Sequence, residues 1–244
     1  METFETDNYM DIQFEYEFES LLDDPEGSRY IQDINARIVR LDDSGNDQVI
    51  GQSNIKMLLL EQAIKDEYSV YDVFDTYEYT RRIGNMIYDF EIEEIKEDLQ
   101  KKLFGAEPIL NTNICIFEKI KILPEYRGLG LGAKFIKNKY DNFSAACGLI
   151  VMQPFPLQLE YRHPQPADSF ESKMNYASME QNESKAAKSL KAFYKRVGFI
   201  SVKGYNELMF LLPGLKNPKL EAIDMNEILL DPNDGYPEQT RSPD

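Results

Sequence analysis

The sequence predicts an α/β fold, because stretches with strand-like alternation of apolar and polar residues are interleaved with stretches of helical spacing. Residues 11–18 alternate Ile, Phe, Tyr and Phe with acidic and amide residues, which is typical of a half-buried strand. Residues 114–144 run from alternating isoleucines through a glycine-rich turn into a helical pattern. The 244 residues, of which 42% are hydrophobic, are enough for one large domain.

Two further strands are expected at residues 34–41 and 49–60, joined by the turn-forming run from Asp42 to Asp47. Together they predict a β-hairpin. Over residues 61–105 the apolar period lengthens to helical spacing, as in Ile83, Met86, Ile87 and Phe90, and then Ile92, Ile95 and Leu99. This predicts a helical segment that ends at a glycine C-cap, Gly105.

The second half of the chain continues the alternation of strands and helices. Residues 145–153 form a near-continuous apolar run, which is typical of an interior strand. Residues 154–177 contain four prolines and predict a long loop. A helix is expected over residues 178–197, opened by the capping pattern Ser178-x-x-Gln181 and closed by Gly198.

The end of the chain predicts a last pair of strands and a tail. The strands are expected at residues 199–203 and 207–212, around a Gly-Tyr-Asn turn. The tail, residues 213–244, is acidic and contains prolines. It carries one apolar cluster over residues 223–230, which we expect to dock on the rest of the domain.

The net charge of −16 is unevenly distributed along the chain. Residues 1–110 hold 27 acidic and 10 basic residues, residues 111–212 hold 9 and 14, and residues 213–244 hold 7 and 3. The middle segment is the only basic part, which favours a polyanionic ligand there, although a requirement for solubility alone also accounts for the pattern. The overall acidity disfavours direct binding of nucleic acid.

No stretch approaches the roughly 18 to 20 consecutive apolar residues of a membrane helix, and the N-terminus is acidic where a signal peptide is basic, so we expect a cytoplasmic protein. The two cysteines, Cys115 and Cys147, lie in separate apolar runs without CxxC spacing, and the single histidine is His163, so no metal site is expected. A disulfide between the cysteines stays open if their strands are neighbours, but a cytosolic setting favours buried thiols.

A strand followed by a glycine-rich turn and a helix is an expected anion site, because unpaired N–H groups and the positive end of the helix dipole converge there. The glycines at 128, 130 and 132 lack the GxGxxG spacing of dinucleotide sites, and no Lys-Ser or Lys-Thr pair follows as in a P-loop. The segment Arg127-Gly128-Leu129-Gly130-Leu131-Gly132 instead resembles the coenzyme A signature of the GNAT N-acetyltransferases, Arg/Gln-x-x-Gly-x-Gly/Ala.

A second segment supports this resemblance. Residues 192–199, Ala-Phe-Tyr-Lys-Arg-Val-Gly-Phe, are similar to the family's late helix, which carries a tyrosine and ends in Gly-Phe. The resemblance covers residues 111–212 well. Over the first 110 residues it rests only on the order of the elements, a strand followed by a hairpin. It implies one GNAT-like domain over residues 1–212, with a mixed, mostly antiparallel sheet that is splayed at its centre and flanked by helices, followed by the acidic tail.

The helical segment 61–105 stands out against this family, in which the early helices normally follow the first strand. It is expected to be an insertion before the coenzyme strand. Such an insertion either builds or covers the acceptor pocket, or it only packs on the sheet.

The resemblance also implies which residues bind acetyl-CoA. The backbone of Ile120, Lys121 and Ile122 is expected to pair with the pantetheine arm in place of a neighbouring strand. The turn is expected to wrap the pyrophosphate through backbone N–H groups; its residues are Arg127, Gly128, Leu129, Gly130, Leu131, Gly132 and Ala133. Three lysines lie along the next helix, Lys134, Lys137 and Lys139. At most one is expected to reach the 3′-phosphate, and a solvated helix face is the other interpretation of each.

Two residues are candidates for acid and base in acetyl transfer. Tyr194 matches the family's tyrosine near the coenzyme sulfur and is the expected general acid, although an amphipathic helix would also bury an aromatic residue there. Glu118 lies where many members carry an acidic residue that deprotonates the amine. The alternative for Glu118 is an edge carboxylate paired with Lys119 or Lys121.

The resemblance therefore implies an N-acetyltransferase that moves an acetyl group from acetyl-CoA to a primary amine by direct attack in a ternary complex. The acidic N-terminal part suggests a cationic acceptor, either an amine-bearing small molecule or a peptide. No membrane partner is expected, nucleic acid is disfavoured, and a homodimer is left open. The alternative function is a non-catalytic module with a GNAT fold that binds an acyl-CoA or a protein.

Overall fold

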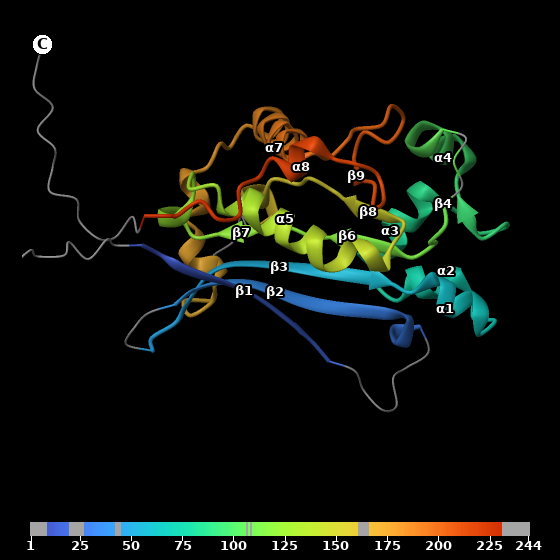
Figure 1. Ribbon diagram of the computed structural model, residues 1–244, viewed down its shortest axis with the longest axis horizontal. Helices are drawn as coiled ribbons and strands as arrows, with labels where there is room; N and C mark the ends of the chain where they lie inside the picture. The colour runs from blue at the N-terminus through green and yellow to red at the C-terminus, as the bar shows by residue number, and fades with distance from the viewer. Residues whose placement is uncertain are drawn as a thin grey trace, which may run out of the picture.

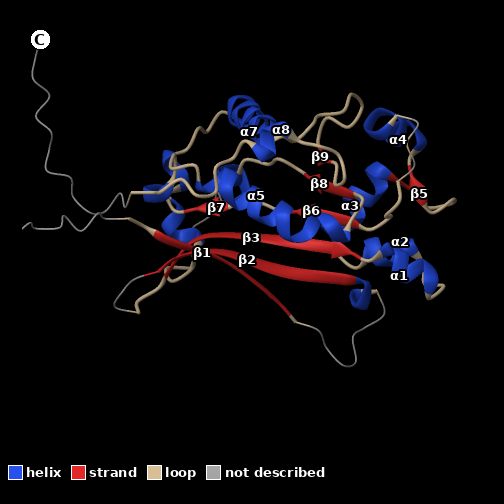
Figure 2. Ribbon diagram, in the orientation of Figure 1, coloured by secondary structure: helices blue, strands red, loops and turns tan. Residues whose placement is uncertain are grey.

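The computed structural model describes residues 9–19, 27–41, 45–105, 107, 109–160 and 166–230. Its main element is a mixed sheet with the strand order β1-β2-β3-β6-β8-β9, in which β7 also pairs with β3. Neighbouring strands are antiparallel except for β6 and β8, which are parallel. Helices flank the sheet (Figures 1 and 2). The predicted α/β class and the mixed, mostly antiparallel sheet are confirmed.

The first three strands form an antiparallel meander of β1 (Asp11–Phe18), β2 (Ile31–Leu41) and β3 (Gln48–Leu58). β1 has the bounds that its alternating pattern predicted. Its apolar side chains pack on a helix, with the ring of Phe14 stacked on Phe135 and that of Tyr16 edge-on to Phe143. The predicted hairpin of β2 and β3 is also confirmed.

The segment between β3 and β6 contains four helices, α1 (Leu60–Lys65), α2 (Val70–Asp75), α3 (Glu78–Ile87) and α4 (Glu97–Phe104). The prediction of helical structure throughout was wrong between α3 and α4. There β4 (Tyr88–Asp89) pairs with β5 (Glu94–Ile95), and Glu93 turns the chain with a positive φ of 52°. Ile92, which continues the helical spacing, is 60% exposed in this turn. Gly105 ends α4 with a φ of 65°.

The central strand, turn and helix follow as predicted. β6 (Ile114–Phe117) leads to β7 (Lys121–Ile122), a short 3₁₀ turn over Pro124–Tyr126, and α5 (Leu131–Phe143). β8 (Leu149–Met152) is shorter than expected, because Ser144–Ala146 form another 3₁₀ turn.

The segment predicted as a long loop contains α6 (Leu157–Glu160) and the 3₁₀ turns Glu171–Met174 and Tyr176–Ser178. His163 lies outside the described residues.

α7 (Glu183–Val197) begins later than the sequence predicted. The expected capping box is absent because the side chain of Gln181 donates to backbone carbonyls instead, while Asn182 caps the helix by accepting from the Lys185 N–H at 3.0 Å. Gly198 closes α7 in the left-handed conformation, as predicted. β9 (Met209–Leu211) pairs with β8, whereas the strand expected just before it is reduced to one bridge, Ile200 to Phe210.

Two apolar cores lie on opposite faces of the sheet, because successive side chains of a strand alternate between its faces. Ile114 and Ile116 of β6 belong to the core that α1–α4 cover. Cys115 and Phe117 belong to the core that α5 and α7 cover. Figure 2 shows α1–α4 grouped at one end of the sheet.

The start of the tail docks on the domain as the sequence predicted. α8 (Pro218–Glu221) is followed by an extended segment in which the Leu229 carbonyl accepts from the Met10 N–H at 2.8 Å and Leu230 bridges Tyr9. Ile223 and Leu229 pack against the core beneath α5 and α7.

None of the helices in the described part of the chain is both long and apolar enough to cross a membrane. Those residues also contain no group of three or more His, Cys, Asp or Glu able to hold a metal ion.

Gly148, just before β8, is required for close approach of the backbone. A Cβ atom there would lie 1.9 Å from the Asn111 carbonyl oxygen. We expect Gly148→Ala to lower the free energy of unfolding by about 2 to 3 kcal/mol, since the clash is with backbone that cannot move away cheaply. Gly45→Ala is the control: its Cβ meets open space and the φ of 76° alone costs about 1 kcal/mol. Urea unfolding of the two variants tests this, and equal losses would contradict it.

Candidate functional site

A β-bulge lies between β6 and β7. Gln52 and Ile55 of β3 are three residues apart in the sequence, whereas their partners, Lys121 and Phe117, are four residues apart. The strand that β6 and β7 form together, here called the bulged strand, therefore contains one extra residue. The Glu118 N–H donates to the Asn54 carbonyl at 2.9 Å and therefore still faces β3. The extra residue falls within Lys119–Ile120.

The bulge changes which backbone groups face away from β3. The Leu123 N–H donates to the Ile50 carbonyl at 2.9 Å, and the direction of backbone groups alternates along a strand. The N–H and C=O groups of Lys121 therefore face β3, whereas those of Ile122 face the opposite side. The Ile122 carbonyl accepts there from the Arg127 Nε at 2.9 Å.

A cavity of about 360 Å³, here called the central cavity, opens beside this segment. β6 and β8 pair from Ile114 to Ile116, and beyond that point the cavity lies between Ile120 on one side and the chain that follows β8, from Gln153, on the other. α7 closes the cavity with Leu190 and Tyr194. The cavity thus occupies the place where the two neighbouring strands stop pairing.

The glycine-rich turn adjoins the central cavity through Arg127, which lines it. Gly128 and Gly130 have φ of 83° and 80°, and a Cβ at either would meet no atom within 4 Å. Glycine is favoured at both positions because other residues rarely adopt a positive φ, and the space around both positions is open. Gly130 is the N-cap of α5. Gly132 instead faces the protein, because a Cβ there would lie 3.2 Å from a Phe193 ring atom and 3.5 Å from the Ile122 side chain.

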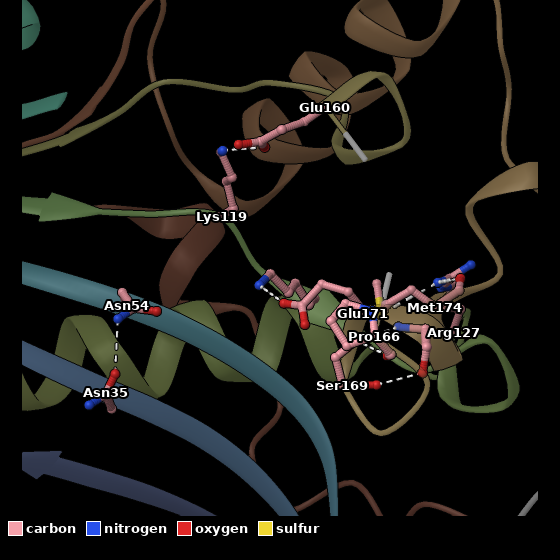
Figure 3. A network of polar contacts seen from close by, with 11 residues as sticks. Asn35, Asn54, Lys119, Arg127, Glu160, Pro166, Ser169, Glu171 and Met174 are labelled. Atoms are coloured by element: carbon pink, nitrogen blue, oxygen red, sulfur yellow. Dashed lines mark hydrogen bonds and ion pairs between the residues drawn. The ribbon is translucent and has the colours of Figure 1, made fainter. Parts of the chain in front are cut away.

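The other residues predicted to bind the coenzyme serve partly in packing. Leu131 is buried, and Leu129 and Ala133 pack against the same core. The Arg127 guanidinium donates to the Met174 carbonyl at 2.6 Å (Figure 3). The Lys121 ammonium bonds Glu171 at 2.5 Å. These two contacts hold the 171–174 turn against the bulged strand.

Tyr194 lines the central cavity from α7 and is 4% exposed. Its ring packs on Phe193 and Phe199 at centroid distances of 5.1 and 5.5 Å. Burial, and to a smaller extent the nearby Tyr79 hydroxyl, raises the pKa of Tyr194 well above its usual value. The structure thus places a protonated phenol at the cavity, together with Ile120 and Arg127.

Glu118 does not line the central cavity. Its carboxylate lies 3.6 Å from the Lys56 ammonium, which also bonds Asp33 at 2.6 Å and lies over the Tyr77 ring. The partners suggested by the sequence are wrong, because Lys119 pairs with Glu160 and Lys121 with Glu171. Burial raises the pKa of Glu118, and Lys56 opposes that rise.

Glu118 lines a second cavity of about 380 Å³, here called the side cavity. Its other lining residues are Glu78, Tyr79 and Arg82 from α3, Lys119 from the bulge and Glu160 from α6. Lys119 lines both cavities, so they adjoin. No sequence pattern points to Tyr79 or Arg82 as site residues, because a tyrosine and an arginine in a polar, tyrosine-rich helical segment resemble a solvated helix face.

Two of the three lysines of α5 depart from the solvated helix face that was one interpretation of the sequence. Lys134 is buried and bonds the Asp224 carbonyl and Glu227 of the docked tail. Lys137 fits that interpretation, since it bonds Asp141 at 2.5 Å near the surface. Lys139 is fully buried, bonds the Ser53 hydroxyl at 2.9 Å and lies over the Phe117 ring. Burial lowers the pKa of Lys139 to about 7.

No protein-family model and no curated protein matches the chain. A solved structure described as "The crystal structure of KacTA-DNA complex" is similar at 12% sequence identity and a TM-score of 0.37. The match covers 76% of this chain and 69% of that chain. A similarity this weak carries no argument about function.

The buried Lys139 makes stability depend on pH. Between its folded pKa of about 7 and the unfolded value of about 10.4, the unfolded chain binds more protons, so this group's contribution to stability rises with pH. We expect Lys139→Met to be stabilised relative to wild type at pH 7. This advantage should shrink by about 1.4 kcal/mol per pH unit as the pH rises through that window.

Urea unfolding at pH 7, 8 and 9 measures this difference. Lys137→Met is the control on the same helix, since Lys137 pairs with Asp141 near the surface. A difference between Lys139→Met and wild type that stays constant with pH would show that Lys139 is not a buried titrating group.

Proposed function

We propose that the chain is an N-acetyltransferase of the GNAT type, which transfers an acetyl group from acetyl-CoA to a primary amine. The observation that carries the proposal is the central cavity. It opens where the bulged strand and β8 stop pairing, with the arginine of the glycine-rich turn and a buried tyrosine in its lining. The two motifs that resemble the GNAT family thus meet at one cavity, although they are far apart in the sequence.

In this proposal the pantetheine arm lies along the bulged strand. Ile120 lines the cavity, and the backbone groups of Ile122 face away from β3, so both can offer backbone hydrogen bonds to an amide-containing chain. Lys121 contributes less than the sequence predicted, because its backbone groups face Gln52 of β3. For the oxyanion we favour the Ile122 N–H, because it is a donor that faces away from β3, whereas the Ile122 carbonyl is an acceptor already bonded by Arg127.

The pyrophosphate would lie at the turn from Arg127 to Ala133. Gly128 and Gly130 leave open space in which a phosphate group can approach the backbone closely. The first turn of α5 adds N–H groups and the positive end of the helix dipole, although the Ala133 N–H is already bonded to the Gly130 carbonyl at 2.9 Å.

The chemistry needs one proton acceptor and one group that holds the leaving sulfur. The amine nitrogen attacks the thioester carbon, a C–N bond forms and the C–S bond breaks. Glu118 accepts the proton lost by the amine, and the sulfur leaves as a thiolate that takes a proton from water as the thiol departs. The raised pKa of Tyr194 favours a phenol that donates a hydrogen bond to this sulfur over one that gives up its proton.

The acceptor is proposed to be a cationic amine-bearing small molecule or peptide that enters from the side cavity. Glu78 and Glu118 line this cavity with Arg82 and the paired residues Lys119 and Glu160, and the N-terminal 110 residues that contribute to it are strongly acidic. A cytoplasmic location is part of the same proposal.

Coenzyme binding can be tested with a matched pair of glycine substitutions. Gly130 and Gly214 have φ of 80° and 81° and both are surrounded by open space, so Glu at either position strains the backbone equally. We expect Gly130→Glu to weaken acetyl-CoA binding at least about tenfold by charge repulsion, and Gly214→Glu to leave it unchanged. Calorimetric titration with acetyl-CoA, with ATP as a control ligand, measures this. Absence of acetyl-CoA binding by the wild type would refute the coenzyme site.

Catalysis can be separated from binding by conservative variants. We expect Glu118→Gln and Tyr194→Phe each to lower kcat for an amine acceptor by about 100-fold while acetyl-CoA affinity is retained. Because burial raises the pKa of Glu118, wild-type activity should rise with pH through a value above the usual pKa of a glutamate, and Glu118→Gln should lose this step. Thiol release assayed from pH 4.5 to 8 gives both results. A binding module would bind acetyl-CoA and release no thiol in any variant.

A further inference from the structure

Tyr79 of α3 lies on the partition between the central and side cavities. Tyr79 lines the side cavity together with Glu118 and Lys119, and Lys119 also lines the central cavity. The Tyr79 hydroxyl lies beside the backbone of Gln153, a residue that lines the central cavity. The side chain therefore lies at the boundary that an acceptor amine would cross.

The position of Tyr79 is fixed by its neighbours. The Arg82 guanidinium lies over its ring at 5.7 Å and also donates to the Gln153 side-chain oxygen. The Gln153 side chain is held in turn by Glu207, at 3.2 Å. The partition thus joins α3 of the inserted helical segment to the end of β8, and Tyr79 cannot swing aside without breaking these contacts.

We propose that Tyr79 determines acceptor specificity by restricting the passage between the two cavities to a slender amine. The preferred acceptor class is a primary amine on an unbranched methylene chain, whose amino group can pass Tyr79 while its remainder stays in the side cavity. A branch at the carbon that bears nitrogen would collide with the ring. This inference rests on the proposed acetyl transfer, and Tyr79 acts here by shape without taking a proton.

The experiment compares matched linear and branched amines. The two pairs are n-butylamine with sec-butylamine, and 1,4-diaminobutane with 2,5-diaminohexane, assayed by thiol release from acetyl-CoA. In the wild type, kcat/KM is expected to favour the linear member of each pair. Tyr79→Ala should reduce this preference by about tenfold or more, mainly by raising kcat/KM for the branched amine. Tyr79→Phe, which keeps the ring, should retain most of the preference.

Tyr71→Ala is the control, since Tyr71 lies in the same helical segment and contacts Phe90 away from both cavities. It should leave the preference unchanged. Acetyl-CoA affinity is measured for every variant, so that loss of the fold is not mistaken for a change in specificity.

The outcomes separate the two proposals. If the wild type transfers acetyl groups but Tyr79→Ala keeps the preference, or if the wild type shows none, the role of Tyr79 is refuted and the acetyltransferase proposal stands. If the wild type acetylates none of these amines and no other primary amine, both proposals fail.

Discussion

The site depends on one backbone irregularity, the extra residue within Lys119–Ile120. In an unbroken antiparallel strand, the backbone groups of Ile122 would point to β3, as those of Glu118 do. The bulge reverses this and directs the backbone groups of Ile122 away from β3. Since β8 pairs with β6 only as far as Ile116, Ile120 of the bulge lines the central cavity instead of pairing in a sheet.

The helical segment between β3 and β6 serves the core and the site at once. Its apolar side chains, such as Phe74 and Ile83, are buried in the core that includes Ile114 and Ile116. That packing fixes α3 beside the end of β8, where Tyr79 meets Gln153. The segment therefore packs on the sheet, as one interpretation of the sequence held, and the same packing brings α3 to the side cavity, where we propose that the acceptor binds.

Local patterns predicted the fold well, and competition between local signals explains the errors. The alternation of β1 and the glycines that end α4 and α7 each depend on neighbouring residues, and each was predicted correctly. The helix after residue 178 began late because Asn182 is the cap actually used. The glycine-rich turn could be predicted because its residues are contiguous. The contact of Tyr79 with Gln153 could not, because it arises only when two distant elements pack together.

The positive charge of residues 111–212 suggested that lysines would attract a polyanion, and the structure redirects this argument. Lys119 and Lys121 are paired with carboxylates, Lys134 is bonded by the docked tail, and Lys139 is buried with a pKa near 7. Little of this charge is therefore available to a phosphate group near the turn. An anion at Gly128 and Gly130 would depend chiefly on backbone N–H groups and the dipole of α5, which a glycine-rich turn supplies without any charged side chain.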